Sequence, residues 1–327
     1  MSRQGRHRKP THSNIKLFWE AEAEEVGGTP EVTIRDHYFR LHELHTLLSL
    51  IPRRSRLMDI GCGTGFGTLI LARRCQSGIG VDYSEKMIQW AQKLRGDPEY
   101  RAKLSREYSP LWDLTSADHS KVEFMSGDVL NLELNIPPFD VITGQRILIN
   151  LPSHDEQMKA LSRLRDHALE GGWLFLTEAT TQGHERTDAY RALFDLPMLE
   201  KYWHNSYVDE SRLSEWPAVG WQVEYNLGFD TYMLLSKLIY PAACGHANCQ
   251  FMSGANAAAM DMANIFRSWH AVQEIGQETF LEMYVSRIQQ YNEDLADKIG
   301  SWIARHGKNL ADWSELGHQR LLIARTR

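Results

Sequence analysis

Long apolar runs and cysteine pairs are both scarce in this chain of 327 residues. No stretch approaches the roughly 18 apolar residues that a membrane-spanning helix needs, and the first residues lack the apolar core of a signal peptide. The four cysteines, Cys62, Cys75, Cys244 and Cys249, form no recognisable disulfide framework. We therefore expect a cytoplasmic protein that has no membrane partner.

The chain also lacks an excess of positive charge, because 36 lysines and arginines face 42 aspartates and glutamates. The formal net charge of -6 at pH 7 disfavours a nucleic-acid-binding surface. Residues 1–13 are basic and are expected to form a disordered tail. We expect a small molecule as partner and no nucleic acid, while the oligomeric state stays open, with a homodimer as one option.

Two familiar motifs are missing as well. Glycine occurs at 61, 63 and 65, but Phe66 and Thr68 stand where the third glycine of the dinucleotide fingerprint G-x-G-x-x-G would be. The segment Cys244-Gly245-His246-Ala247-Asn248-Cys249 offers three metal ligands, but no second cluster completes a tetrahedral site. We therefore expect neither a dinucleotide nor a metal.

The chain does contain a strand–turn–helix–strand pattern between residues 57 and 82. The run Leu57–Ile60 leads into a glycine turn at 61–65, an amphipathic segment follows, and a second apolar run ends at Asp82. Glycine permits positive φ and lets a ligand approach the backbone closely. An acid that ends the second strand is placed to bind ribose hydroxyls. This pattern predicts a nucleoside cofactor.

The loop Asp59-Ile60-Gly61-Cys62-Gly63-Thr64-Gly65, with Asp82, resembles motif I of the class I S-adenosylmethionine-dependent methyltransferases. The segments 145–153, 178–183 and 203–205 together resemble the bacterial small-molecule and sugar-modifying members. The resemblance implies S-adenosylmethionine as cofactor and S-adenosylhomocysteine as product. It implies that Asp82 binds the ribose, that Asp128 accepts a hydrogen bond from the adenine amino group, and that Val129 offers its backbone amide. The other cofactor-binding residues expected are Asp59, Gly61, Cys62, Gly63, Gly65, Tyr83, Met87 and Gln145.

Strand and helix patterns alternate along most of the chain, which predicts an α/β fold with a doubly wound, mostly parallel sheet. The strands expected are 56–61, 78–82, 122–125, 139–143, 173–178, 221–225 and 319–325, and by resemblance the last two form an antiparallel hairpin. Helices are expected at 14–25 and 33–51, from Ser153 to about Leu169, and over 183–200. We expect a seven-stranded Rossmann-like core at 14–230 and 313–327, with a helical cap at 231–312 inserted before the last strand. The role of residues 95–120 cannot be inferred.

Candidates for catalysis must lie beyond the carboxyl ends of the strands or on the cap. The candidate bases are His204, in a polar aromatic segment, His154 and Glu178, whereas Arg146 is a candidate for binding a carboxylate or a structural ion pair. Packing, capping or ion-pair roles remain open for each of them. Candidate substrate-binding residues are Asn150, Gln182, Trp203, Asn205 and Tyr207.

The function expected is methyl transfer to an oxygen or nitrogen of a small molecule, such as a metabolite, sugar or peptide intermediate. The Asn/Asp-Pro-Pro-Tyr/Phe signature of nucleic-acid amino-methylating enzymes is absent after residue 143, which disfavours a nucleobase acceptor. Two alternatives remain: an aminopropyl transferase on the same fold, and a non-catalytic S-adenosylmethionine-binding protein.

Overall fold

The computed structural model describes residues 10–115, 118–246, 249–310, 313 and 316–326. Helix α1 begins at His12, where the side chain of Thr11 accepts a hydrogen bond from the N–H of Asn14 and caps the helix. The predicted tail at 1–13 is therefore helical at its last two residues, and its first nine lie outside the described residues.

A seven-stranded sheet forms the centre of the molecule, with the strand order β3-β2-β1-β4-β5-β7-β6. Its strands are β1 Arg56–Ile60, β2 Ser77–Asp82, β3 Val122–Ser126, β4 Phe139–Gln145, β5 Ala168–Ala179, β6 Trp221–Gly228 and β7 Gln319–Thr326. The first five strands pair in parallel, and β7 runs antiparallel to both β5 and β6. The predicted doubly wound, mostly parallel sheet with a terminal antiparallel hairpin is confirmed.

Helices surround the sheet and fill the long connection between β6 and β7. The α-helices are α1 His12–Glu25, α2 His37–Leu50, α3 Phe66–Leu71, α4 Glu85–Gly96, α5 Pro98–Tyr108, α6 His154–Asp166, α7 Thr181–Ala192, α8 Asp230–Met233, α9 Tyr240–Cys244, α10 Gly254–Ile265, α11 Trp269–Ile275, α12 Gln277–Gln289 and α13 Glu293–His306. Short 3-10 helices are η2 Pro30–Val32, η3 Ala72–Arg74, η4 His119–Lys121, η5 Val129–Asn131, η6 Leu148–Asn150, η7 Glu210–Val219 and η10 Gly307–Asn309, and η8 Leu234–Ile239 is a π-helix.

Local sequence explains most element boundaries, with two exceptions. Helix α6 begins at the predicted cap Ser153, but it ends at Asp166 rather than near residue 169, and β5 already begins at Ala168. The Gly171-Gly172 pair is not a helix end. It lies within β5, where the pairing with β4 shifts register and Gly171 takes a φ of +72°. The helix predicted over 183–200 is the shorter α7.

Two apolar cores lie on the two faces of the sheet. Leu57 of β1 packs with α3 on one face, and the next residue, Met58, packs with α6 on the other, as the alternation of a strand requires. The core on the Leu57 side continues without interruption into the helices α8–α13, which we call the cap helices. The cap helices therefore share an apolar core with the sheet.

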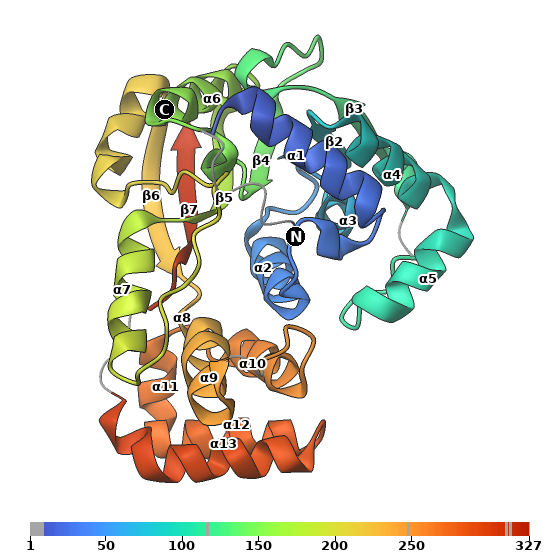
Figure 1. Cartoon of the computed structure of the whole chain (residues 1–327). Coiled ribbons are helices and arrows are strands. Elements are labelled where there is room, and N and C mark those ends of the chain that lie inside the picture. The colour runs from blue at the N-terminus through green and yellow to red at the C-terminus, as the bar shows by residue number, and fades with distance from the viewer. Residues whose placement is uncertain (1–9, 116–117, 247–248, 311–312, 314–315, 327) are drawn as a thin grey trace.

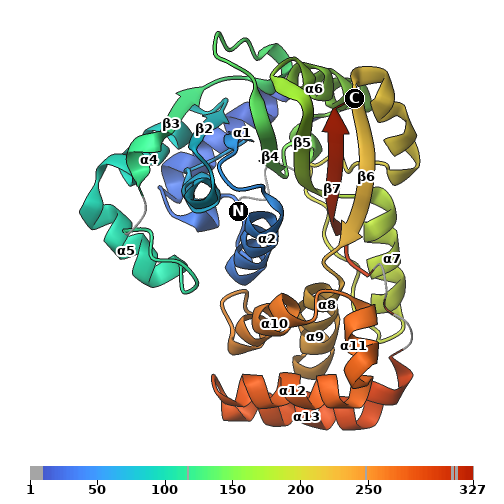
Figure 2. The ribbon, with the colours of Figure 1, turned by 180° about the vertical axis from the view of Figure 1, so that it is seen from behind.

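The cap helices lie beyond the edge of the sheet at which the parallel strands end (Figures 1 and 2). A polar junction at Asp36, the N-cap of α2, fixes their position. Its carboxylate accepts hydrogen bonds from Tyr232 Oη at 2.5 Å and from Lys237 Nζ. Within the described residues, no helix is both long and apolar enough to cross a membrane.

Candidate active site

A cavity of about 880 Å³ opens where the parallel strands end. Its walls come from the loops after β1, β2, β3 and β4, from α1 and α2, from the segment 198–207, and from the cap helices. In an open α/β sheet this crevice is where ligands bind. The cavity brings together residues of the predicted cofactor site and residues of the predicted substrate site.

The glycine turn after β1 has the expected backbone. Gly61, Gly63 and Gly65 have φ values of +69°, +54° and +77°, and the first two line the cavity. Gly65 does not line it; a Cβ there would lie 2.6 Å from the ring of Phe124, so this glycine allows the turn to pack. Asp59 connects the elements on either side of the turn. Its carboxylate accepts hydrogen bonds from Thr68 Oγ1 of α3 at 2.6 Å and from Thr143 Oγ1 of β4 at 2.8 Å.

Asp82 is a buried carboxylate at the end of β2, with 8% of its surface exposed. It accepts one hydrogen bond at each oxygen, from Gly63 N–H and from Ser84 N–H, both at 2.9 Å. Each oxygen therefore keeps a free lone pair toward the cavity that Asp82 lines. Burial raises the pKa of Asp82 to about 6, although the two N–H groups lower it.

Asp128 lies at the corresponding position after β3. Its Oδ1 accepts from Leu130 N–H at 2.9 Å and is 3.4 Å from His12 Nε2 of α1. Burial raises the pKa of this carboxyl, but the His12 and Leu130 contacts outweigh it and the net pKa is lowered. Cys62, Met87 and Val129 line the same part of the cavity, as does Tyr83, whose buried hydroxyl has no partner among the described residues.

Behind the glycine turn lies a group of buried charges. Arg146, with a φ of +59°, donates to Glu43 Oε1 at 2.5 Å and more weakly to Gln145 Oε1 at 3.4 Å. Arg40, one turn before Glu43 on α2, also lines the cavity, and burial lowers its pKa to about 9. The four side chains place two guanidinium groups and one carboxylate at this wall.

The predicted substrate-binding segment forms an aromatic wall. The ring of His204 stacks on Phe18 of α1 at 4.5 Å between ring centroids and on Tyr202 at 5.7 Å. His204 lines the cavity, as do Asn205 and Tyr207, whereas Trp203 lies behind it and contacts Phe18 edge-on. Burial lowers the pKa of His204 to about 4, so its imidazole is neutral near pH 7.

Asn150 is a further predicted residue at the cavity, but both ends of its side chain are bonded. Its Oδ1 accepts from Trp19 Nε1 at 3.0 Å, and its Nδ2 donates to the carbonyl of Arg146 at 2.6 Å. Asn150 therefore ties α1 to the loop after β4.

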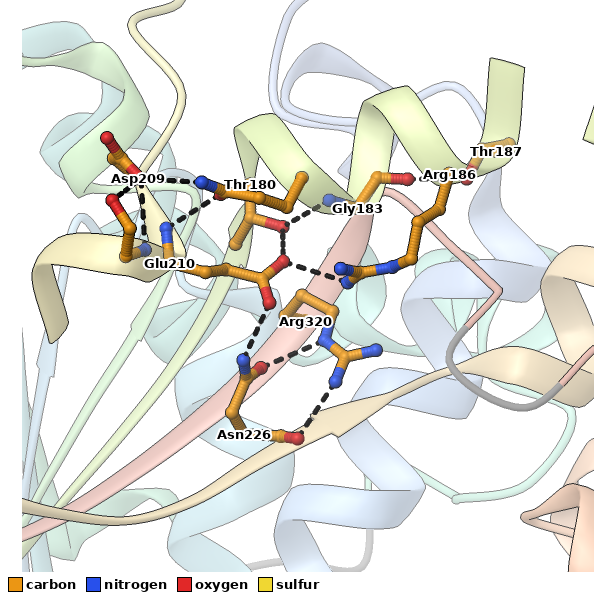
Figure 3. A network of polar contacts seen from close by, with 10 residues as sticks. Thr180, Gly183, Arg186, Thr187, Asp209, Glu210, Asn226 and Arg320 are labelled. Carbon is orange, nitrogen blue, oxygen red and sulfur yellow. Dashed lines mark hydrogen bonds and ion pairs between the residues drawn. The ribbon is translucent and has the colours of Figure 1, made fainter. Parts of the chain in front are cut away.

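Besides Gly65 and Trp203, three further predicted site residues lie outside the cavity, contrary to expectation. His154 contacts Glu215 at 3.0 Å near the surface. Gln182 donates to Asp209 at 2.6 Å and accepts from Glu210 N–H at 2.8 Å. Glu210 belongs to the polar network of Figure 3, where its carboxylate accepts hydrogen bonds from Thr180, Arg186 and Asn226 and joins α7 to the β6–β7 hairpin.

Glu178 is the third, and it is completely buried. Its Oε1 accepts from the N–H groups of Ile147 and Leu148 at 2.9 Å, and its Oε2 accepts from Ile149 N–H at 3.2 Å. Burial raises the pKa of Glu178 to about 7 against these hydrogen bonds. The carboxyl thus holds the loop after β4 and has no access to a substrate.

The cavity fits S-adenosylmethionine at its β1–β3 end. Asp82 retains free lone pairs for ribose hydroxyls, and Tyr83 retains an unpartnered buried hydroxyl beside it. Gly61 and Gly63 present backbone without a Cβ to the same space. The residues that face this space are thus the donors and acceptors that a nucleoside needs.

Several residues in or beside the cavity were not predicted from the sequence. Arg40 and Glu43 lie at a spacing of three on the apolar face of α2, a pattern that indicates buried charge. Arg191 and Lys237 line the part of the cavity beneath the cap helices. Nothing in their local sequence separates them from surface cations.

A family model described as "Methyltransferase domain" matches residues 34–224. No curated protein sequence matches the chain.

Similar solved structures include three methyltransferase-like chains. The N-methyltransferase NodS from Bradyrhizobium japonicum with S-adenosylhomocysteine is 18% identical, with a TM-score of 0.45, covering 65% of this chain and 89% of that chain. The DhpI–S-adenosylhomocysteine complex is 20% identical, with a TM-score of 0.44, covering 65% and 90%. Magnesium protoporphyrin IX methyltransferase from Synechocystis is 20% identical, with a TM-score of 0.39, covering 58% and 78%.

Glu178→Ala should destabilise the fold strongly. The change leaves three buried N–H groups without an acceptor, and each such group costs about 1–3 kcal/mol, so we expect a loss on the order of 3 kcal/mol or more. Urea unfolding followed by circular dichroism measures it. The matched control Glu185→Ala, an exposed glutamate on α7, should leave the midpoint nearly unchanged. Wild-type stability of Glu178→Ala would contradict the assigned role.

The affinity for S-adenosylhomocysteine should fall as the pH drops below about 6. Hydroxyl donors favour the ionised carboxylate, so binding lowers the raised pKa of Asp82 and requires loss of its proton in acid. Asp82→Asn should remove this pH dependence and weaken binding by about 1–3 kcal/mol. Isothermal titration calorimetry between about pH 5 and pH 8 checks both.

The exposed control Asp297→Asn on α13 should keep the wild-type profile. If wild-type affinity were constant across this range, Asp82 would not be the ribose acceptor.

Proposed function

This chain belongs to the methyltransferase family whose domain model spans residues 34–224, and on that premise we propose that it transfers the methyl group of S-adenosylmethionine to an oxygen or nitrogen of a small molecule. One observation carries the proposal: a single cavity is lined by the buried carboxylate of Asp82 at one end and by His204 among aromatic rings at the other. Donor and acceptor can thus share one enclosed space.

The cofactor end is assigned to the residues that follow β1, β2 and β3. Asp82 would accept from the ribose hydroxyls, Asp128 from the adenine amino group, and Gly61 and Gly63 would line the space between. Arg146 and Gln145 follow β4, where the methionine end would lie. When bound, S-adenosylmethionine supplies a methyl carbon on a positively charged sulfur that an acceptor lone pair can attack.

His204 is the proposed base for the acceptor. Burial lowers the pKa of His204 to about 4, so its ring is neutral at pH 7 and its Nδ1, unpartnered among the described residues, can accept a hydrogen bond from a hydroxyl or an amine. The same burial weakens the ring as a base, so its proposed role is to take the acceptor's proton as the methyl group transfers. The stacked rings of Phe18 and Tyr202 hold the imidazole in one plane. The same rings give this part of the cavity an apolar wall.

The segment 231–312 is proposed as the substrate cap on a core formed by 14–230 and 313–327. Two features support this division. The cap helices contribute Met233, Lys237 and Tyr240 to the cavity, and Asp36 ties them to α2. An acceptor would therefore be enclosed by side chains that lie outside the matched family domain.

The proposal is tested first by cofactor binding and then by turnover. Calorimetry with S-adenosylmethionine and S-adenosylhomocysteine should show binding of both. Formation of S-adenosylhomocysteine should then follow addition of a panel of hydroxyl- and amine-bearing metabolites. Absence of binding to both nucleosides would overturn the proposal, and turnover of the decarboxylated cofactor alone would identify an aminopropyl transferase.

His204→Phe should lower kcat by about 100-fold or more while leaving the dissociation constant of S-adenosylhomocysteine unchanged, because the ring stacking survives and only the base is lost. Initial-rate assays with an acceptor identified in the metabolite panel measure kcat and KM separately. His270→Ala, an exposed histidine of α11, is the matched control and should be unaffected. Full turnover by His204→Phe would exclude His204 as the base.

A further inference from the structure

The part of the cavity beneath the cap helices contains a buried arginine that makes no ion pair with a carboxylate of the described residues. Arg191, near the end of α7, has 1% of its surface exposed and lines the cavity. Its guanidinium donates to neutral acceptors only: the carbonyl of Pro197 at 2.8 Å, the carbonyl of Lys237, and His246 Nδ1 at 3.2 Å. A guanidinium buried in this way pays a desolvation cost that neutral acceptors offset only in part.

The nearest acid on the same helix, Asp188, acts on Arg191 through space but makes no ion pair with it in the described structure. Asp188 is bonded elsewhere: one oxygen accepts from Leu199 N–H at 2.8 Å, and the other lies 3.2 Å from His184 Nδ1. On the cavity side, Glu200 is exposed to solvent and so contributes a screened charge.

A second cation, Lys237, lies near Arg191, and one carboxylate neutralises its charge. Lys237 of η8 pairs with Asp36, whose carboxylate is shared with Tyr232. Together Arg191, Lys237 and Asp36 leave one net positive charge at this wall. His246 adds none at neutral pH, because burial and the two cations lower its pKa.

Unsatisfied polar atoms face the same space. Asn256 of α10 and Gln319 at the start of β7 are buried and line the cavity, and the oxygen of each side chain has no hydrogen-bond partner among the described residues. Buried polar atoms in folded proteins are nearly always satisfied, so such atoms at a cavity wall indicate a ligand or ordered water. Arg191 needs a hydrogen-bond acceptor, whereas the side-chain oxygens of Asn256 and Gln319 need a hydrogen-bond donor.

We infer that the methyl acceptor carries an anionic oxygen group, a carboxylate or a phosphate, that binds Arg191 and Lys237 beneath the cap helices, with hydroxyl or amide donors directed to Asn256 and Gln319. This inference rests on the proposed function, because it names the substrate class of the same cavity. The bound anion would supply the negative charge that Arg191 lacks. Arginine suits this role, since its planar donors match carboxylate and phosphate oxygens.

The sheet order separates this subsite from the cofactor end. Asp82 and Asp128 follow β2 and β3, on one half of the sheet, whereas Arg191 and Gln319 belong to the half formed by β5 and β7. The aromatic wall at His204 also lines this cavity. An acceptor anchored by its anion at Arg191 would thus have the remainder of its structure free to reach His204.

The test compares three probes of one shape: benzoate, phenyl phosphate and benzamide. Each is titrated into the full chain saturated with S-adenosylhomocysteine, and binding is followed by calorimetry or ligand-observed NMR. At least one anion should bind about tenfold or more tightly than neutral benzamide, as expected for charge-assisted hydrogen bonds. A preference for benzoate identifies a carboxylate site, and a preference for phenyl phosphate identifies a phosphate site.

Matched variants locate the preference. Arg191→Gln should abolish it without changing the affinity for benzamide or S-adenosylhomocysteine, and Arg191→Lys should retain part of it. Arg163→Gln, an exposed arginine of α6, removes the same charge far from the cavity and should keep the wild-type preference.

The two levels of proposal fail separately. Equal affinities for the three probes, or no binding of any, in wild-type protein that binds S-adenosylhomocysteine would overturn the anionic subsite alone. A preference that survives in folded Arg191→Gln would also overturn it. The wild-type comparison needs no variant, so it decides the question even if Arg191→Gln does not fold. Failure to bind S-adenosylhomocysteine would instead overturn the proposed function.

Discussion

The hydrogen bond from Gly63 N–H to the carboxylate of Asp82 is the contact on which the site depends. It joins the glycine turn after β1 to the end of β2, so that two strand ends present their ligand-binding groups to one space. The carboxylate is buried at this position, and the loss of hydrating water raises its pKa to about 6, which is a cost to its ionised form. A ribose with two hydroxyl donors would reverse that cost, because it replaces the water that the carboxylate has lost.

Helix α1 links the two ends of the cavity. At its start, His12 contacts Asp128 of the proposed adenine site, and two turns later Phe18 stacks on His204 of the proposed acceptor site. Trp19 adds a hydrogen bond to Asn150 in the loop after β4. One helix thus contacts residues of both proposed binding sites, so its position affects the geometry of each.

Several buried charges around the cavity are balanced, whereas Arg191, like Arg40, hydrogen-bonds only to neutral acceptors within the described residues. Arg146 is paired with Glu43, and Lys237 is paired with Asp36. Glu178 has no cation in contact but accepts three N–H groups, which serve the same purpose. Among these four groups, Arg191 has only neutral hydrogen-bond acceptors within the described residues, so a negatively charged ligand would stabilise it.

The sequence allowed the sheet and the cofactor end to be predicted because their signals are local: the Asp59–Gly65 turn and Asp82 lie within 24 residues. The acceptor end has no such signal. Arg191 meets Lys237 and His246 across 46 and 55 residues, and Asp36 meets Lys237 across 201. Glu178 was predicted to face the cavity, whereas its carboxylate accepts hydrogen bonds from three loop amides. An acid at a strand end has the same sequence pattern in both cases. Methyltransferases on this fold can therefore keep a recognisable donor site while the acceptor site changes through contacts that no short motif records.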